Sequence, residues 1–163
     1  MLVELAARAA EDTRGIGAAL APLLRAGDAV ALTGELGAGK TTFVQGVAKA
    51  LGFDGVVASP TFTLVREYRT PTLLLVHADV YRLDRVQDVI DLGFADMLDE
   101  PSVLLVEWGD AVEALLPEDH LVVELTVPGQ DDARSIAIRP VGRGWNARWE
   151  RLEQAVDPWR IAG

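Results

Sequence analysis

The stretch Gly34-Glu35-Leu36-Gly37-Ala38-Gly39-Lys40-Thr41 decides how this chain folds, because it fits the pattern G-x4-G-K-[ST] of phosphate-binding loops at every fixed position. The mostly apolar residues 28–33 before it predict a buried strand, and residues 42–51 after it predict a helix. Glycines let the backbone wrap around an anion, so that successive N–H groups and the helix N-terminus point at phosphate oxygens. The order strand, glycine-rich turn, helix therefore favours a nucleotide-binding loop over a plain turn that caps a helix.

The lysine of this loop stands out in a chain with 13 arginines and two lysines, Lys40 and Lys49. A lysine at this position reaches the outer phosphates of a nucleotide, and the hydroxyl of Thr41 is then placed to bind Mg²⁺. Glu35 is unusual inside an anion-binding loop, and we expect its side chain to point away from the phosphates. The loop residues expected to contact nucleotide are Glu35, Leu36, Gly37, Ala38, Gly39, Lys40 and Thr41.

The composition is that of a globular protein that occupies one domain, residues 1–163. No apolar run approaches the roughly 20 residues that span a bilayer, and no signal peptide is evident, so we expect a cytoplasmic protein without a membrane segment. The absence of cysteine excludes disulfides and thiolate chemistry. A net charge of −10 makes unaided binding to nucleic acid unfavourable, so any RNA is expected to be held by another subunit.

The hydrophobic pattern predicts an α/β fold of the P-loop NTPase type, a three-layer sandwich around a mostly parallel sheet. An antiparallel hairpin is expected to interrupt the sheet, since the extended segments 63–68 and 73–76 are joined by a short turn. A second antiparallel pair is expected at the C-terminal end, from strands 121–127 and 135–138. The remaining expected elements are helices 11–25, 84–98, 110–116 and 145–156 and a buried strand at 103–106.

Two acidic residues follow apolar strands where a phosphate loop needs a carboxylate for Mg²⁺. Glu107 comes directly after its apolar run, at the edge where parallel strands end and ligands bind, and is the better metal-side carboxylate. Asp79 lies three residues past its apolar run, and it is then available to orient or deprotonate the attacking water. Either acid could instead cap the helix that follows it.

The sequence gives weaker support for a functional role of the other polar and aromatic residues near these strands. Thr61 follows Ser59-Pro60, where switch-type NTPases place a threonine that closes on the γ-phosphate, although a plain turn residue fits equally well. Arg82 could stabilise transition-state charge or pair with a surface acid. Trp108 could belong to the core or face a partner. His77 and Tyr81 could pack at the sheet edge with no role beyond their hydrogen bonds.

Four segments together resemble the TsaE family, the bacterial ATPases of tRNA threonylcarbamoyladenosine biosynthesis. The first is the phosphate loop itself, which countless NTPases share, whereas H-x-D-x-Y-R followed by V-E-W is far more specific. The resemblance runs from about Glu11 to Leu125, and the part from Pro128 onward carries no motif that we can match. The four segments are residues 34–42, Ser59-Pro60-Thr61-Phe62, His77-Ala78-Asp79-Val80-Tyr81-Arg82 and Val106-Glu107-Trp108.

The resemblance implies binding of ATP and Mg²⁺ and slow hydrolysis that partner proteins stimulate. The implied partners are TsaD and TsaB, which modify the adenosine beside the anticodon of tRNAs that read ANN codons, so tRNA is met only through the complex. It also implies that Lys40 and Thr41 or Thr42 bind nucleotide and metal, with Thr61 as a switch-like residue and Trp108 associated with activity. Glu107 would bind the metal, and Asp79 would be catalytic.

Two other functions fit the loop less well. A small-molecule kinase usually begins with the strand that leads into the loop, whereas a helix is predicted to come first here. A nucleotide-gated binding module would bind ATP and leave it intact. Neither explains the H-x-D-x-Y-R and V-E-W segments, and the lack of an N-K-x-D sequence argues against a GTPase of the Ras type.

Overall fold

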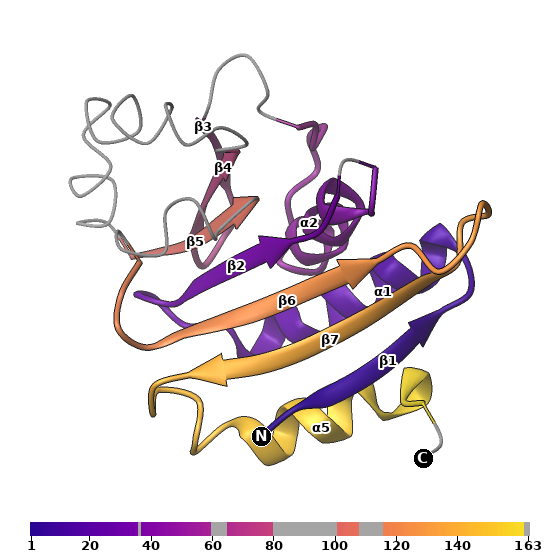
Figure 1. The fold of residues 1–163 in the computed structure, drawn as a ribbon. Helices are drawn as coiled ribbons and strands as arrows, with labels where there is room; N and C mark the ends of the chain where they lie inside the picture. The colour runs from indigo at the N-terminus through magenta and orange to yellow at the C-terminus, as the bar shows by residue number, and fades with distance from the viewer. Residues whose placement is uncertain (36, 60–64, 80–100, 108–115, 162–163) are drawn as a thin grey trace.

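The computed structural model describes residues 1–35, 37–59, 65–79, 101–107 and 116–161. These residues form one seven-stranded sheet in the order β1-β7-β6-β2-β5-β4-β3 (Figure 1). The strands are β1 Val3–Ala7, β2 Ala29–Thr33, β3 Val65–Arg69, β4 Leu74–Asp79, β5 Ser102–Glu107, β6 His120–Thr126 and β7 Arg134–Val141. The helices are α1 Ala10–Leu20, α2 Lys40–Ala50 and α5 Trp149–Val156, with short 3₁₀ turns η1 Ala21–Leu23 and η4 Asp157–Trp159.

The four central strands β6, β2, β5 and β4 run parallel. Every residue of β4 and β5 is buried, as expected for parallel strands, whose two faces are both covered. Because parallel strands end at the same edge, the loop after β2 and the last residues of β4 and β5 meet there. The predicted α/β class with a mostly parallel core is confirmed.

Antiparallel strands flank this core on both sides. The predicted β3–β4 hairpin is confirmed, although it adds β3 at the edge of the sheet and does not interrupt the parallel strands. The predicted C-terminal pair β6–β7 is also confirmed. The sequence analysis missed β1, which pairs with β7 and buries alternate residues, Val3, Leu5 and Ala7. A strand therefore precedes α1, so the helix is not the first element, although it comes before β2, the strand that leads into the loop, as predicted.

The helices α1, α2 and α5 pack against one face of the sheet and share a single hydrophobic core with it (Figure 1). The axes of α1 and α2 lie close because both helices carry glycine at the contact. A Cβ on Gly17 would lie 2.4 Å from the carbonyl oxygen of Phe43, and one on Gly46 would lie 2.0 Å from that of Arg14. This contact fixes α2, and with it the loop at its N-terminus, against the rest of the domain.

Two helix boundaries differ from the prediction by more than one turn. The first helix was expected to reach Arg25 but ends at Leu20, where the chain tightens into η1 around Pro22. The last helix was expected from Trp145 and begins at Trp149. The turn before it is tied to the sheet, because the guanidinium of Arg148 binds both carboxylate oxygens of Asp28 at 2.6 and 3.0 Å.

The predicted helix 84–98 and residues 110–115 of the predicted helix 110–116 lie outside the described residues. The sheet has a second face, opposite α1, α2 and α5. A smaller apolar cluster on that face includes Ala31, Val76, Leu104 and Val106. No helix within the described residues combines the length and the apolar character needed to cross a membrane.

Candidate nucleotide and metal site

The predicted phosphate loop joins β2 to α2 at the carboxyl edge of the parallel strands (Figure 1). Gly37 and Gly39 have φ angles of +83° and +104°, a region that favours glycine, and Gly39 immediately precedes the first residue of α2. The side chain of Lys40 is buried and folds back over the loop, where Nζ donates a hydrogen bond to the carbonyl oxygen of Gly34 at 2.6 Å. The loop therefore encloses its ammonium group.

The two predicted carboxylates lie side by side. β4 continues through Asp79, three residues beyond the predicted end of its apolar run, so Asp79 is paired in register with Glu107 of β5. Both residues are buried, at 5% and 3% exposed. Burial and the charge of Glu107 raise the pKa of Asp79, while Ser59, Lys40 and His77 oppose that shift. Asp79 is thus inclined to accept a proton.

Burial also acts on the lysine of the loop. It lowers the pKa of Lys40 to about 8, and the charges of Glu107 and Asp79 oppose the shift without reversing it. An anion bound beside this ammonium group would favour its charged form. The ammonium group of Lys40 attracts a further anion, and the carboxylates of Asp79 and Glu107 attract a further cation.

Thr41 and Glu107 meet across the site. Thr41 Oγ1 lies 3.1 Å from Oε2 and 3.3 Å from Oε1 of Glu107, so the hydroxyl is presented to the carboxylate. Thr42 lines the same pocket. Of the two candidate threonines, Thr41 is the one whose hydroxyl contacts the metal-side acid.

His77 and Tyr68 hold Glu107 from the other side. Nε2 of His77 lies 2.5 Å from Oε2 of Glu107, and Nδ1 lies 3.0 Å from the hydroxyl of Tyr68. Tyr68 in turn donates to the carbonyl oxygen of Ala58 at 3.2 Å. The sequence analysis gave His77 no particular role and did not consider Tyr68. The spacing H-x-D was the available signal, because residues two apart in a strand share a face.

These residues surround a pocket of about 200 Å³. Ser59 donates to Oδ2 of Asp79 at 3.1 Å, whereas Oδ1 of Asp79 is buried and has no hydrogen-bond partner among the described residues. A buried carboxylate oxygen without a partner is unfavourable unless a ligand, water or ion completes it. The residues that line the pocket are Gly37, Gly39, Lys40, Thr41, Thr42, Ser59, Asp79 and Glu107.

The donor set fits Mg²⁺, which prefers oxygen ligands and is commonly held by one or two carboxylates together with phosphates. Thr41 and Glu107 supply such oxygens. In the described part of the chain, no three His, Cys, Asp or Glu side chains converge into a metal cage made by the protein alone. The site is therefore suited to a metal ion that arrives with a phosphate ligand.

Some of the predicted site residues are not part of this geometry. Glu35 is exposed, in agreement with the expectation that it points away from the phosphates. Leu36, Thr61, Arg82 and Trp108 lie outside the described residues, as does Tyr81.

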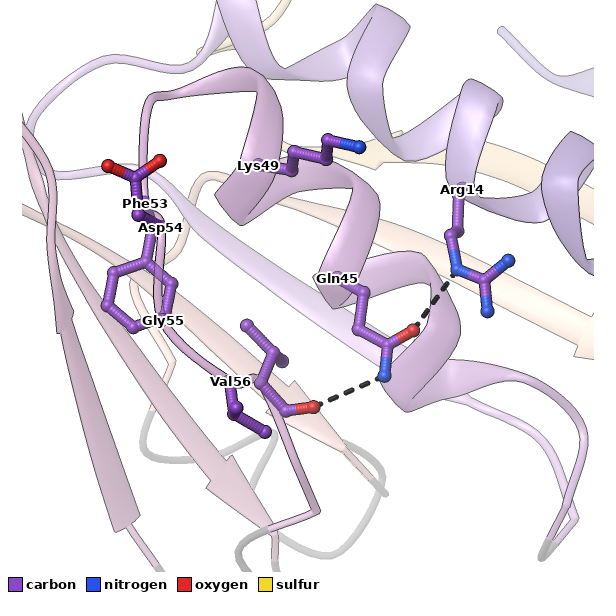
Figure 2. A pocket seen from close by; sticks show the side chains of 8 residues that line it. Arg14, Gln45, Lys49, Phe53, Asp54, Gly55 and Val56 are labelled. Atoms are coloured by element: carbon purple, nitrogen blue, oxygen red, sulfur yellow. Dashed lines mark hydrogen bonds between the residues drawn. The ribbon is translucent and has the colours of Figure 1, made fainter.

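A larger pocket of about 450 Å³ lies at the other end of α2 (Figure 2). Figure 2 shows Gln45 between two partners: it accepts a hydrogen bond from Nε of Arg14 at 3.2 Å and donates to the carbonyl oxygen of Val57 at 3.2 Å. This pocket contains neither the carboxylate pair nor the phosphate loop, so its size does not make it the chemical site. Its contacts hold the segment that leads to Ser59.

Comparisons with known proteins agree on one family. The family model described as "Threonylcarbamoyl adenosine biosynthesis protein TsaE" matches residues 7–136. The tRNA threonylcarbamoyladenosine biosynthesis protein TsaE of Bacillus subtilis is 39% identical over 144 residues, which cover 88% of this chain and 89% of that protein. The TsaE protein of Treponema pallidum is 42% identical and covers 74% of this chain and 88% of its own length. The crystal structure of Bacillus subtilis YdiB matches with a TM-score of 0.79 and 33% identity, over 94% of this chain and 95% of that one.

Proposed function

This chain belongs to the TsaE family, and from that membership and the site geometry we propose that it is a Mg²⁺-dependent ATPase of tRNA threonylcarbamoyladenosine biosynthesis. It acts in the cytoplasm with the TsaD and TsaB proteins and meets tRNA only through that complex. The observation that carries the proposal is the convergence of Lys40, Thr41, Asp79 and Glu107 on one pocket at the end of the parallel strands. Its net charge of −10 suits a subunit that does not grip tRNA alone.

The phosphate loop binds the triphosphate of ATP. Backbone N–H groups of Gly37 and Gly39 and the N-terminus of α2 supply hydrogen bonds and a positive end. Lys40 contributes an ammonium charge to the outer phosphates. Its hydrogen bond to the Gly34 carbonyl holds that group near the loop before ATP arrives. Thr42 and Thr61 contribute further contacts to the nucleotide.

Thr41 and Glu107 hold Mg²⁺, which neutralises phosphate charge and orients the phosphates. The contact between the threonine hydroxyl and the carboxylate supports this assignment, since both groups already face one point. His77 fixes the carboxylate through Nε2. This arrangement limits the reorganisation that metal binding requires.

Asp79 orients the attacking water and accepts its proton. Two features support this role: the raised pKa of Asp79, and the Oδ1 atom that has no protein partner within the described residues. Ser59 holds the other oxygen and so fixes the direction in which Oδ1 points. A general base must be both positioned and able to take up a proton.

The test is the release of inorganic phosphate from ATP, measured for the protein alone and with TsaD, TsaB and tRNA. We expect slow release alone and faster release in the complex, with loss of the stimulated rate in Asp79→Asn. ATP that stays intact in the complete mixture would support a nucleotide-gated binding module instead. Turnover that requires an added acceptor and yields a phosphorylated product would support a small-molecule kinase.

A further inference from the structure

Among the described residues of the phosphate loop, internal support includes the hydrogen bond from Nζ of Lys40 to the carbonyl oxygen of Gly34 at 2.6 Å. Gly34, Gly37 and Gly39 all have positive φ angles, and a Cβ on Gly37 would meet no atom within 4 Å. Glycine loses more conformational freedom on ordering than other residues, so a loop of this composition needs support from outside. One internal backbone hydrogen bond, from the N–H of Ala38 to the carbonyl oxygen of Glu35 at 3.0 Å, closes the turn.

Arg134 supplies contacts from a distant part of the sequence. It is the first residue of β7, which follows β6, and β6 runs parallel to β2, so β7 starts at the edge where the loop lies. Its Nε donates to the carbonyl oxygen of Ala38 at 3.0 Å, and its Nη2 donates to that of Gly37 at 3.2 Å. Its Nη1 donates at 2.7 Å to the carbonyl oxygens of Asp131 and Ala133, in the β6–β7 turn.

We propose that Arg134 is a positioning residue that holds the phosphate loop in its binding shape through these two carbonyl groups. The C=O and the next N–H belong to one planar peptide and point in opposite directions. Fixing the carbonyl of Ala38 from the β7 side therefore fixes the direction of the N–H of Gly39. Fixing the carbonyl of Gly37 supports the N–H of Ala38 in its hydrogen bond to Glu35, which closes the turn. A charged donor on a carbonyl also strengthens the N–H of the same peptide as a donor.

Arginine is suited to this role because its rigid planar fork donates several hydrogen bonds at once. Lysine keeps the charge but presents a single donor atom, so it cannot bond the two loop carbonyls and the β6–β7 turn together. A simpler role for Arg134 would be to close the β6–β7 turn through Asp131 and Ala133 alone. The two roles differ in which amides lose protection when the side chain is removed.

Hydrogen–deuterium exchange of the nucleotide-free protein separates these roles. The variant is Arg134→Met, which keeps an apolar stem, and the control is Arg139→Met, an exposed arginine on the same strand. We expect Arg134→Met to speed exchange in a peptide covering residues 34–41 by on the order of tenfold, and Arg139→Met to leave it unchanged. Faster exchange confined to residues 127–133 would overturn the proposal.

Calorimetry with ADP then tests the consequence for binding, which rests on the proposed function. Arg134→Met should raise the Kd by about tenfold, and Arg134→Lys should recover only part of that loss. Full recovery by lysine, or weaker ADP binding with unchanged exchange in residues 34–41, would overturn the proposal, since charge or direct ligand contact would then explain the effect. If the wild-type chain binds no ADP, the proposed function fails, whereas the exchange experiment still decides the role of Arg134.

Discussion

His77→Leu tests whether the buried histidine holds the metal-side carboxylate. Leucine replaces most of the volume of the ring and removes the donor at Nε2, which lies 2.5 Å from Glu107. Both side chains are buried, His77 completely and Glu107 at 3% exposed, so water cannot easily replace the lost bond. Thr41 still donates to the carboxylate. The variant also removes the contact of Nδ1 with the hydroxyl of Tyr68 at 3.0 Å, but that hydroxyl keeps its hydrogen bond to Ala58, so the larger loss falls on Glu107.

The expected cost follows mainly from the hydrogen bond to the carboxylate, because the hydroxyl of Tyr68 keeps a partner. A hydrogen bond to a charged group contributes about 1.5–3 kcal/mol, and a buried acceptor that loses its donor sits at the upper end of this range. We therefore expect His77→Leu to lower the free energy of unfolding by about 3 kcal/mol. Domains of this kind have about 5–15 kcal/mol in total, so the variant should still fold.

A double-mutant cycle isolates the pair. Urea unfolding of the nucleotide-free protein would be measured for wild type, His77→Leu, Glu107→Gln and the double variant. Charge-assisted hydrogen bonds are roughly twice as strong as neutral ones, so His77→Leu should cost about 1 kcal/mol less when residue 107 is glutamine. The expected coupling energy is thus about 1 kcal/mol.

His120 provides the matched control. It is also buried, but it lies at the start of β6 and its Nδ1 is 2.9 Å from the carbonyl oxygen of Pro117. His120→Leu and Glu107→Gln should be additive within about 0.5 kcal/mol. Additive effects of His77→Leu and Glu107→Gln as well would refute the claim that His77 holds the carboxylate.

Three further predictions concern the loop, the base and the helix contact. The pKa of Lys40 is about 8 in the nucleotide-free protein, so ATP binding above that pH must take up a proton, and the affinity for ATP should fall as the pH rises from 7 to 9.5. Lys40→Ala should weaken ATP binding at pH 7 and remove this dependence of affinity on pH. Calorimetry that finds equal affinity of the wild type at both pH values would contradict the prediction. Asp79→Asn should keep ATP affinity and lose phosphate release, and it should raise the Tm at pH 7. The raised pKa of Asp79 means that the folded state disfavours its carboxylate, which costs stability as the pH rises above the unfolded pKa of 3.8. A lower Tm of Asp79→Asn at pH 7 would contradict this reasoning. Gly46→Ala should lower the free energy of unfolding by about 3 kcal/mol or more, because its Cβ would meet the backbone of Arg14, whereas Gly129→Ala, where no atom lies within 4 Å, should change it little.

The sequence was sufficient for the central sheet because its strands are short apolar runs bounded by turns. It was insufficient for β1, whose five residues alternate too briefly to distinguish a strand from an irregular segment. The partner that stabilises β1 is β7, near the other end of the chain. Long-range pairing of this kind leaves no mark in a local window.

The same limit applies to the site. Lys40, Thr41, Asp79 and Glu107 were predicted from local patterns, and the structure brings them to one pocket. The side chains that hold these residues in place come from neighbouring strands, and their positions depend on the register of those strands. Tyr68 reaches His77 from β3, and Arg134 reaches the loop from β7.

The end of β4 shows why position mattered more than residue type. The apolar run suggested that the strand stops at Val76, three residues before Asp79. Pairing with β5 extends the strand through Asp79, because β5 continues to Glu107 and offers backbone partners. That extension puts the two carboxylates at the same level, which the sequence alone did not establish.

The affinity for ATP with and without Mg²⁺, measured by calorimetry on wild type and Glu107→Gln, tests the central claim most directly. We predict that wild type binds ATP more tightly with Mg²⁺ than in EDTA and that Glu107→Gln loses most of this gain while binding metal-free ATP about as well. Equal affinity of wild type with and without Mg²⁺, or no detectable binding of ATP in either condition, would contradict the account.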